Sequence, residues 1–184
     1  MGYTHYWYRQ EELDKENFSN AIKDIALLLS FTEGQDFPVG YNHATRVIDV
    51  FELNSTSINF NGIGEQAHET FSIEQTYLPS NDILYEMDKD KLWKFSCCKT
   101  SFENFPYKPY DLYVTACLYI FKYHLGDEFL VCSDGDVSDW SKGIQMVQDI
   151  LGYPDWIADF EFDKEPVRVM TSWQKNNVAT GLKA

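Results

Sequence analysis

Residues able to perform acid–base chemistry or to bind an anion are concentrated in four short segments of the chain. These residues are His68 and Glu69, Lys99 and Thr100, Lys108 and Asp111, and Ser133 and Asp134. Histidine and glutamate side chains act as general acids or bases, and lysine amines make charge-assisted hydrogen bonds to anions. The segments lie far apart in the sequence, so they form one site only if the fold brings them together.

None of these segments is a complete catalytic, metal-binding or cofactor-binding motif. His68-Glu69 lacks the second histidine, four residues on, that a zinc protease requires. Ser133 does not stand in the G-x-S-x-G turn of a hydrolase. We therefore expect no metal ion and no cofactor. A Cys98 nucleophile with His68 as its base remains an alternative, since both residues are expected at one edge of the sheet.

Three helices and six strands are predicted to position these segments. Apolar side chains recur three and four residues apart over about 16–31, 111–125 and 139–151, which is the period of a half-buried helix. Gly126 and Gly152 end the second and third helices, and Ser138 caps the third. Strands are predicted over about 3–8, 47–52, 57–60, 69–75, 92–98 and 128–132.

The resulting order, β-α-β-β-β-β-α-β-α, predicts an α+β fold. Consecutive strands without helices between them favour a mainly antiparallel meander, with the three helices packed on one side. The length fits a single domain over residues 1–184. Residues 153–184 are predicted to form an irregular tail that packs on the body, with the last ten residues loose.

An antiparallel order returns alternate strand ends to the same edge of the sheet. One edge is predicted to collect Asn61, Gly62, Gly64, His68, Glu69, Lys99, Thr100, Lys108, Asp111, Ser133, Asp134 and Gly135. The second and third helices begin at that edge, and their free N–H groups favour an anion. His5 and Trp7 alternate along the first strand, so they share a face that is either core or pocket.

Each of these residues also has a purely structural interpretation. Asn61-Gly62 is a turn in which glycine supplies a positive φ. Asp134 precedes a helix cap, and His68 is a hydrogen-bonded structural residue. Lys99 is by default a solvated surface lysine. The predicted convergence on one edge, and no single residue, therefore supports a binding site.

The balance of charge excludes a general role on nucleic acid. Fifteen Lys and Arg residues oppose 29 Asp and Glu residues, which gives a net charge of −14. Such a chain repels a long polyphosphate. A local basic pocket for one small phosphorylated ligand remains compatible with this charge, and so does an acidic surface that binds a basic partner.

The cysteines and the apolar segments predict a cytoplasmic protein without a membrane span. Cys97, Cys98, Cys117 and Cys132 include no C-x-x-C pair, and they are expected to be reduced, buried thiols. The first residues lack the basic and apolar regions of a signal peptide. The longest apolar stretch is far too short to cross a bilayer.

Several short segments resemble a group of small uncharacterised proteins from bacteriophages and from bacterial genomes that carry phage DNA. The segments are Met-Gly-Tyr-Thr-His-Tyr-Trp at the start, 68–71, 98–100, 108–111 and 133–135. The likeness covers roughly residues 1–152, and the opening heptapeptide is its most specific part. The chain departs from the group by a charged stretch over about 77–91 and by residues 101–107. The resemblance implies a phage accessory protein in the host cytoplasm, and no mechanism.

Three functional hypotheses follow. The first is a protein that binds a small anionic or phosphorylated ligand at the predicted edge, for example a nucleotide signal that a phage sequesters in host defence. The second is an enzyme acting on such a ligand, with His68 or Glu69 as the acid–base group and Lys99 as the charge stabiliser. The third is an acidic interaction protein that blocks a host factor. The sequence sets no oligomeric state.

Overall fold

The computed structural model describes residues 3–31, 41–42, 47–48, 52–62, 66–78, 93–101, 108–154 and 161–162. Its helices are α1 (Lys15–Ser30), α3 (Asp111–Leu125) and α4 (Val137–Leu151), and a short 3-10 turn, η2 (Gly126–Glu128), follows α3. The three predicted helices are confirmed to within two residues at each end.

Most of the described strands belong to two mainly antiparallel sheets. The larger sheet has the order β7 (Trp93–Ser101), β1 (Tyr3–Gln10), β8 (Phe129–Ser133) and β9 (Glu161–Phe162). The smaller has the order β4 (Glu52–Leu53), β5 (Ser57–Phe60) and β6 (Phe71–Glu74), and β2 (Tyr41–Asn42) pairs with β3 (Val47–Ile48). All pairs are antiparallel except β8 with β9. The fold class is therefore α+β, as predicted.

The prediction of one continuous meander is wrong. β1 lies between β7 and β8, and β4, β5 and β6 form a sheet of their own. Five of the eight residues of β1 are buried, namely Tyr3, Thr4, His5, Trp7 and Arg9. A strand so extensively buried gains most from neighbours on both sides, and sequence periodicity does not specify which strands those are.

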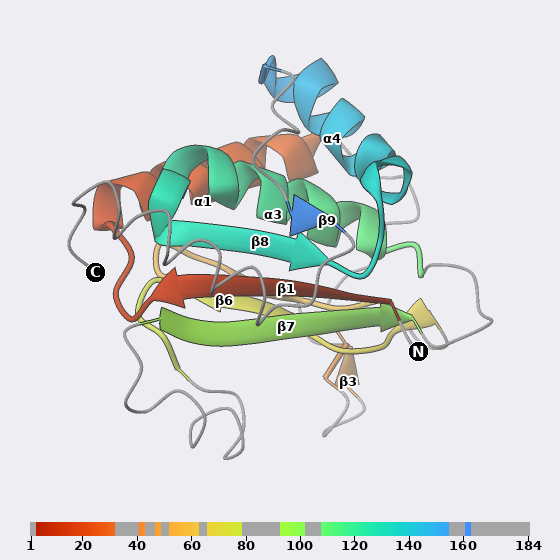
Figure 1. Ribbon diagram of the computed structural model, residues 1–184, viewed down its shortest axis with the longest axis horizontal. Helices are drawn as coiled ribbons and strands as arrows, with labels where there is room; N and C mark the ends of the chain where they lie inside the picture. Colours follow the sequence, from red (N-terminus) through yellow and green to blue (C-terminus); the bar gives the residue numbers. More distant parts are fainter. Residues whose placement is uncertain are drawn as a thin grey trace.

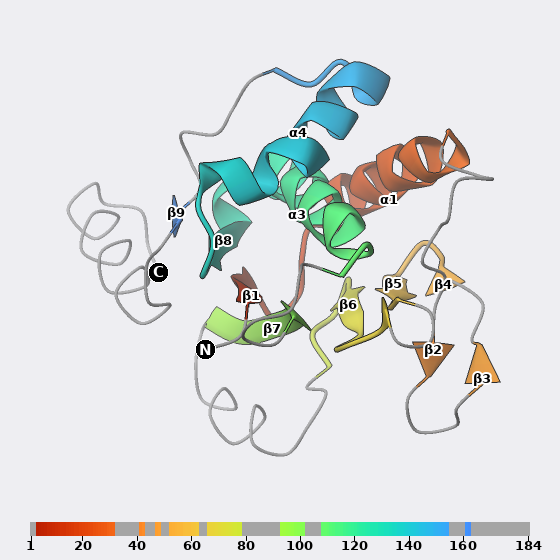
Figure 2. The same cartoon turned by 90° about the vertical axis from the view of Figure 1, so that its right-hand side faces the viewer.

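The helices gather on one side of the strands (Figure 2). The described apolar residues form one hydrophobic core, in which Trp7 from β1, Phe18 from α1 and Trp140 from α4 are almost completely buried. Helix α3 lies between the other helices and the sheet, and nine of its residues between Tyr113 and Leu125 belong to this core. Of the strands of the larger sheet, β8 lies nearest to the helices (Figure 1).

The helix ends follow the predicted chemistry with one change. Gly126 and Gly152 cap α3 and α4 with positive φ of 54° and 70°. The N-cap of α4 is Asp136 instead of Ser138, because the Asp136 carboxylate reaches the N–H groups of both Ser138 and Asp139. A carboxylate also interacts favourably with the helix dipole, which a serine hydroxyl does less strongly.

The predicted irregular tail includes one ordered pairing. Glu161 and Phe162 of β9 lie opposite Cys132 and Ser133 of β8. The rest of the predicted tail, residues 155–160 and 163–184, lies outside the described residues. Among the helices that the structure describes, none has the length and apolar character needed to cross a membrane.

Candidate functional site

The predicted edge exists, and β1 is the strand that creates it. β7 and β8 both run antiparallel to β1, so their last residues lie beside its first residues (Figure 1). Lys99 is opposite Thr4, and Ser133 is opposite His5. The convergence of these residues was predicted correctly, although the meander from which it was predicted is wrong.

His5 is the centre of a buried hydrogen-bond network at this edge. Its Nε2 lies 2.8 Å from Asp111 Oδ1, and its Nδ1 lies 3.2 Å from Ser133 Oγ. Thr100 Oγ1 donates to the same Asp111 oxygen at 2.5 Å. The backbone N–H of Gly135 donates to Ser133 Oγ at 3.1 Å. Because an ionised carboxylate only accepts, Nε2 carries a proton, and a neutral ring then accepts from Ser133 at Nδ1.

The order Ser133–His5–Asp111 is that of a nucleophile, a base and an orienting acid. His5 and Ser133 expose none of their surface, and Asp111 exposes 6%. The rings of Tyr3 and Trp140 cover His5 edge-on, at centroid distances of 4.8 and 5.1 Å. Ser133 Oγ therefore has no access to a substrate in this conformation, and the network fastens α3 and the end of β8 to β1.

A second set of hydrogen bonds joins the two sheets at the same edge. The N–H of Glu69 donates to the carbonyl of Lys99 at 3.3 Å, and the N–H of Lys99 donates to the Glu69 carboxylate at 2.7 Å. Tyr110 Oη donates to the carbonyl oxygens of both residues, at 2.9 and 3.3 Å. Glu69, a predicted acid–base group, is thus part of this sheet junction.

The alternative of a Cys98 nucleophile has no support in the geometry. Cys98 Sγ donates to the Glu69 carbonyl at 3.6 Å. Burial raises the pKa of the Cys98 thiol well above its ordinary value, and the charge of Glu69 adds to this effect. A neutral, fully buried thiol is a poor nucleophile.

Asn61, Gly62 and His68 hold a turn in place. Asn61 Nδ2 donates to the His68 carbonyl at 3.0 Å, and Asn61 Oδ1 accepts from the N–H groups of Gly62 and His68. The expectation that Gly62 supplies a positive φ is wrong, since only Gly126 and Gly152 do so among the described residues. A Cβ at position 62 would lie 2.1 Å from the carbonyl oxygen of Gln66, so a close backbone approach requires glycine there.

The start of α4 does not offer the free N–H groups predicted there. The Asp136 carboxylate accepts from the N–H groups of Ser138 and Asp139, and the Asp139 carboxylate accepts from the N–H of Asp136. Asp134 accepts from the N–H of Thr4 and from Tyr6 Oη, each at 3.1 Å. Three carboxylates therefore surround this helix start. At α3 no side chain caps the first turn, and the Lys108 carbonyl accepts from the N–H of Asp111 at 2.9 Å.

A cleft lies between β6 and β7, in the space between the two sheets. Its volume is about 250 Å³. The lining residues are Trp7, Asn59, Thr70, Ser72, Glu74, Leu78, Ser96 and Cys97. Of these only Trp7 was predicted. Figure 2 shows β7 and β6 side by side, at the junction of the two sheets. We call this space the β6–β7 cleft.

Hydrogen bonds close the β6–β7 cleft at both ends. The junction of Glu69 and Lys99 closes one end, and Tyr77 Oη, which donates to the Phe95 carbonyl at 3.1 Å, closes the other. Phe95 and Lys99 are four positions apart on β7, so about 13 Å of strand separates these two flanking contacts. Trp7 is 1% exposed and closes the bottom, where it packs against Phe71, whereas Leu78 at the mouth is 65% exposed.

Main-chain groups of both strands face the β6–β7 cleft. Lys99 and Phe95 direct their carbonyls toward the β6 side, where Glu69 and Tyr77 donate to them. Successive residues of a strand alternate in this direction. Cys97, midway between them, therefore directs its own N–H and carbonyl into the cleft.

Side-chain oxygens dominate the wall formed by β5 and β6. Ser72 Oγ lies 2.5 Å from Asn59 Oδ1 and 2.5 Å from Glu74 Oε1. On the β7 wall, burial together with the nearby charge of Glu69 raises the pKa of the half-buried Cys97 thiol to about 11. The cleft thus combines oxygen acceptors with an uncharged thiol.

The sequence does contain a signal for this wall, but only in part. Asn59 on β5, and Ser72 and Glu74 on β6, alternate with the buried Ile58, Phe60, Phe71 and Ile73, so they were predictable as the polar face of a hairpin. That this face lies beside β7 follows from the packing of the second sheet, which the alternation does not specify.

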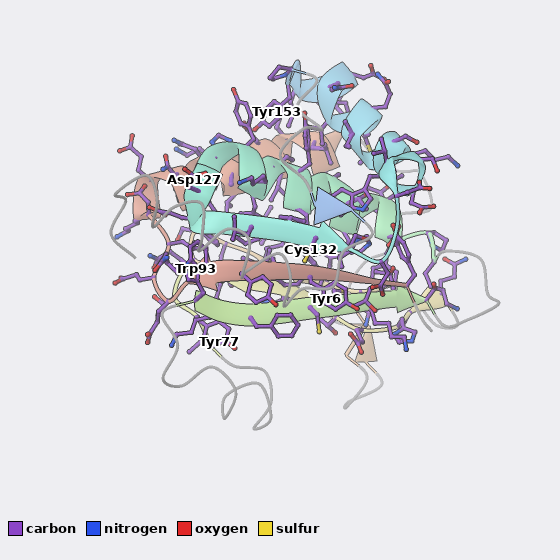
Figure 3. All side chains as sticks on the ribbon, in the orientation of Figure 1. Tyr6, Tyr77, Trp93, Asp127, Cys132 and Tyr153 are labelled. Carbon is purple, nitrogen blue, oxygen red and sulfur yellow. The ribbon has the colours of Figure 1, made fainter. Side chains whose placement is uncertain are left out.

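A third polar cluster lies at the opposite end of α3. His124 Nε2 lies 2.8 Å from Asp24 Oδ2 of α1, and Tyr153 Oη, which follows α4, contacts both residues. Burial and the hydrogen bond to Asp24 raise the pKa of Tyr153. Tyr153 lies among the helices, far from Tyr6 and Tyr77 along the strands (Figure 3). His124 is therefore distant from the predicted edge, as expected.

All four cysteines are free thiols, and Cys98, Cys117 and Cys132 are buried. Within the described ranges, no group of three or more His, Cys, Asp or Glu residues is placed to hold a metal ion. Comparison of the chain with protein-family models, with curated proteins and with solved structures found no match.

Proposed function

We propose that this protein binds a small polar molecule, and that the ligand occupies the β6–β7 cleft. The observation that carries the proposal is a cleft of about 250 Å³, lined mainly by hydroxyl, amide and carboxylate groups at the junction of two sheets. Ligand sites commonly lie where structural units meet, and this volume is slightly below their usual range, which begins at about 300 Å³. A metabolite-sized ligand fits best.

The residues around the cleft enclose it, and this enclosure favours a bound ligand over bulk water. Trp7 closes the bottom, and hydrogen-bonded junctions close both ends. A ligand held there exchanges hydrogen bonds with side chains that rigid strands already position, so binding costs little ordering of the protein.

The proposal retains the binding role expected from the sequence and changes the place and the charge of the ligand. The edge expected to hold an anion presents the carboxylates of Asp134, Asp136 and Asp139, and Asp136 already occupies the start of α4. Among the residues that the structure describes, the lining of the β6–β7 cleft contains Glu74 and neither lysine nor arginine. An uncharged or cationic polar ligand therefore agrees better with the geometry than a phosphorylated one.

The cellular setting is part of the proposal. Four free thiols are typical of a reducing compartment, and the opening heptapeptide resembles that of uncharacterised phage proteins, which implies the host cytoplasm. We place the binding protein there, and assign catalysis to none of its residues.

A substitution that fills the cleft tests the proposal. Ser96 lines the cleft and is half-buried, and leucine at this position projects three more carbon atoms into the space. Ser19→Leu on α1 is the matched control, since Ser19 is also partly buried and lies away from the cleft. Thermal-shift screening of a panel of small polar metabolites is expected to identify compounds that raise the Tm of the parent and of Ser19→Leu, and leave Ser96→Leu unchanged.

The contrary outcomes are equally clear. If no compound stabilises the parent, or if every stabilising compound acts on Ser96→Leu as strongly as on Ser19→Leu, the ligand does not lie in the β6–β7 cleft. Native mass spectrometry of the purified proteins gives an independent measure, because a retained ligand adds mass to the parent and not to Ser96→Leu.

A further inference from the structure

We infer that the ligand of the β6–β7 cleft carries a compact amide, such as a lactam or a carboxamide, which the main-chain N–H and carbonyl of Cys97 bind as they would a neighbouring strand. This inference rests on the proposed binding function and specifies the chemical class of the ligand. It follows from the direction of the main-chain groups along the two strands that border the cleft.

Contacts on both sides of Cys97 fix the direction of its main chain. The carbonyl of Lys99 accepts from the N–H of Glu69 at 3.3 Å. The carbonyl of Phe95 accepts from Tyr77 Oη at 3.1 Å. Both carbonyls therefore point away from β1 and toward the β6 side. Because main-chain groups alternate between the two sides of a strand, the N–H and carbonyl of Cys97 point the same way.

The pairing of β1 supports this direction independently. The N–H of Asp134 donates to the carbonyl of Thr4 at 3.1 Å, so the main chain of Thr4 is directed toward β8 and away from its opposite residue on β7, Lys99. Tyr6 lies two positions further along β1 and opposite Cys97, so it is directed toward β8 as well. The main-chain groups of Cys97 thus lie on the outer edge of β7.

The outer edge of β6 faces the same space. The N–H of Gln75 donates to the carbonyl of Thr56 at 2.8 Å, which directs Gln75 toward the β5 side. By alternation Glu74 is directed away from β5, and its carbonyl accepts from the Arg9 guanidinium of β1. Ser72 is two positions before Glu74 and lines the cleft, so its N–H and carbonyl also point away from β5 and into the cleft.

Two strand edges therefore border the cleft without pairing. β6 and β7 belong to different sheets. Within the described residues, no hydrogen bond joins the main chains of Ser72 and Cys97 across the cleft. Each of these two residues offers one N–H donor and one carbonyl acceptor there, and main-chain groups in protein interiors are nearly always paired. A ligand pairs with such an edge completely only if it has a donor and an acceptor side by side.

An amide has this arrangement. In a lactam or a primary carboxamide the N–H and the carbonyl lie side by side, so the carbonyl accepts from the N–H of Cys97 while the N–H donates to the Cys97 carbonyl. Paired residues of antiparallel strands exchange the same two bonds. A carboxylate or phosphate has no donor and is repelled by Glu74, and an ammonium group has no acceptor. A neutral amide is therefore the better match.

The ends of the cleft favour a compact amide over an extended peptide. The bonds between Glu69 and Lys99 close one end, and the bond from Tyr77 to Phe95 closes the other. About 13 Å of strand lies between these contacts. A longer peptide strand would have to break one of them, whereas a lactam or carboxamide fits between them.

The test uses the diketopiperazine of glycine and its N,N′-dimethyl derivative, which share one ring and its two carbonyls and differ in their N–H donors. Isotope-labelled protein is titrated with each ring, and the signals of the main-chain N–H groups are followed by NMR. The unmethylated ring is expected to bind the parent and to shift the N–H signals of Cys97 and Ser72. The methylated ring is expected to bind at least about tenfold more weakly, because it leaves the strand carbonyl without a donor.

A proline substitution removes the Cys97 N–H and leaves the β1 ladder intact. Proline is tolerated at an edge strand where its N–H is not part of the ladder. Cys97→Pro is therefore expected to fold and to bind the unmethylated ring about tenfold more weakly than the parent. Cys97→Ala is the matched control, because it removes the thiol and keeps the N–H, and it is expected to bind as the parent does. Ser96→Leu is expected to abolish binding.

The inference is overturned if the unmethylated ring does not bind, if both rings bind the parent equally, or if a folded Cys97→Pro binds as tightly as Cys97→Ala. Should Cys97→Pro not fold, the comparison of the two rings on the parent decides alone. Shifts confined to N–H groups outside the cleft overturn the inference, as does tighter binding of an extended glycine tripeptide. If the metabolite screen identifies a compound without an amide that Ser96→Leu excludes, the binding function stands and only the amide is wrong.

Discussion

At the scale of single residues, burial decides what reactive side chains can do. Ser133, His5 and Asp111 have the order of a catalytic triad, yet His5 and Ser133 are completely buried and hydrogen-bonded within the protein. Asp111 accepts from two donors, His5 and Thr100, that have few other partners at this depth. The free energy of these bonds therefore contributes to folding.

Removing the Asp111 carboxylate should be strongly destabilising. Asp111→Ala leaves the His5 and Thr100 donors buried without their acceptor, and we expect a loss of about 3 kcal/mol in the free energy of unfolding. Urea unfolding followed by tryptophan fluorescence measures this loss. The control is Asp127→Ala in the exposed turn after α3, expected to change stability by at most about 0.5 kcal/mol. Equal stability of the two variants would show that the network contributes nothing to folding.

The sequence predicted the position of His5 and not its role. Alternation along the first strand placed His5 and Trp7 on one face, and both are buried on the same side of β1. Whether each lies in the core or in a pocket depends on the neighbouring elements, which are distant in sequence. Helix α3 supplies Asp111 to His5, and the second sheet leaves a cleft beside Trp7.

At the scale of elements, the first turn of α4 has its free N–H groups capped by a carboxylate from the residue just before the helix. Hydrogen bonds from the hydroxyl and the N–H of Ser138 lower the pKa of Asp136 below its ordinary value of 3.8. A carboxylate with a lowered pKa in the folded state stabilises that state above its unfolded pKa. This contribution is lost as the pH falls through the folded pKa.

A cap substitution tests this reading by its pH dependence. Asp136→Ala is expected to lower the Tm by roughly 2–4 °C at neutral pH, and the difference from the parent should shrink as the pH falls through the lowered pKa of Asp136. Asp136→Asn keeps an acceptor oxygen, so it should retain most of the stability at neutral pH. A difference between parent and Asp136→Ala that is as large at pH 2.5 as at pH 7 would contradict the role of the ionised carboxylate.

Helices were predictable to within two residues because their signals are local. Apolar spacing and the glycines at 126 and 152 lie within each helix or directly after it. Strand pairing is not local. β1 pairs with β7 and β8, which follow it by about 90 and 120 residues, and no periodicity within β1 identifies these partners.

At the scale of the whole molecule, the function we propose depends on a junction between two sheets. The charged edge found in the sequence does exist, but its side chains bond one another and fasten the sheets and helices together. The β6–β7 cleft is formed where that edge and the Tyr77–Phe95 bond hold the sheets side by side. The residues predicted at the edge thus hold the two sheets together beside the cleft. The alternation of polar residues along β5 and β6, a weaker feature of the sequence, indicates the residues of the cleft wall.

Protection of Cys97 from alkylation tests occupancy of the β6–β7 cleft most directly. Cys97 lines the cleft and is the one cysteine that is not buried, so Cys98, Cys117 and Cys132 serve as internal controls. Because the pKa of Cys97 is raised to about 11, its reaction with N-ethylmaleimide is slow enough near pH 8 to follow by peptide mass spectrometry. The rate is measured with and without the dialysable small molecules of a deproteinised cell extract. We predict that the extract slows the modification of Cys97 in the parent and in Ser19→Leu. An unchanged rate with the extract would contradict a ligand site in the β6–β7 cleft.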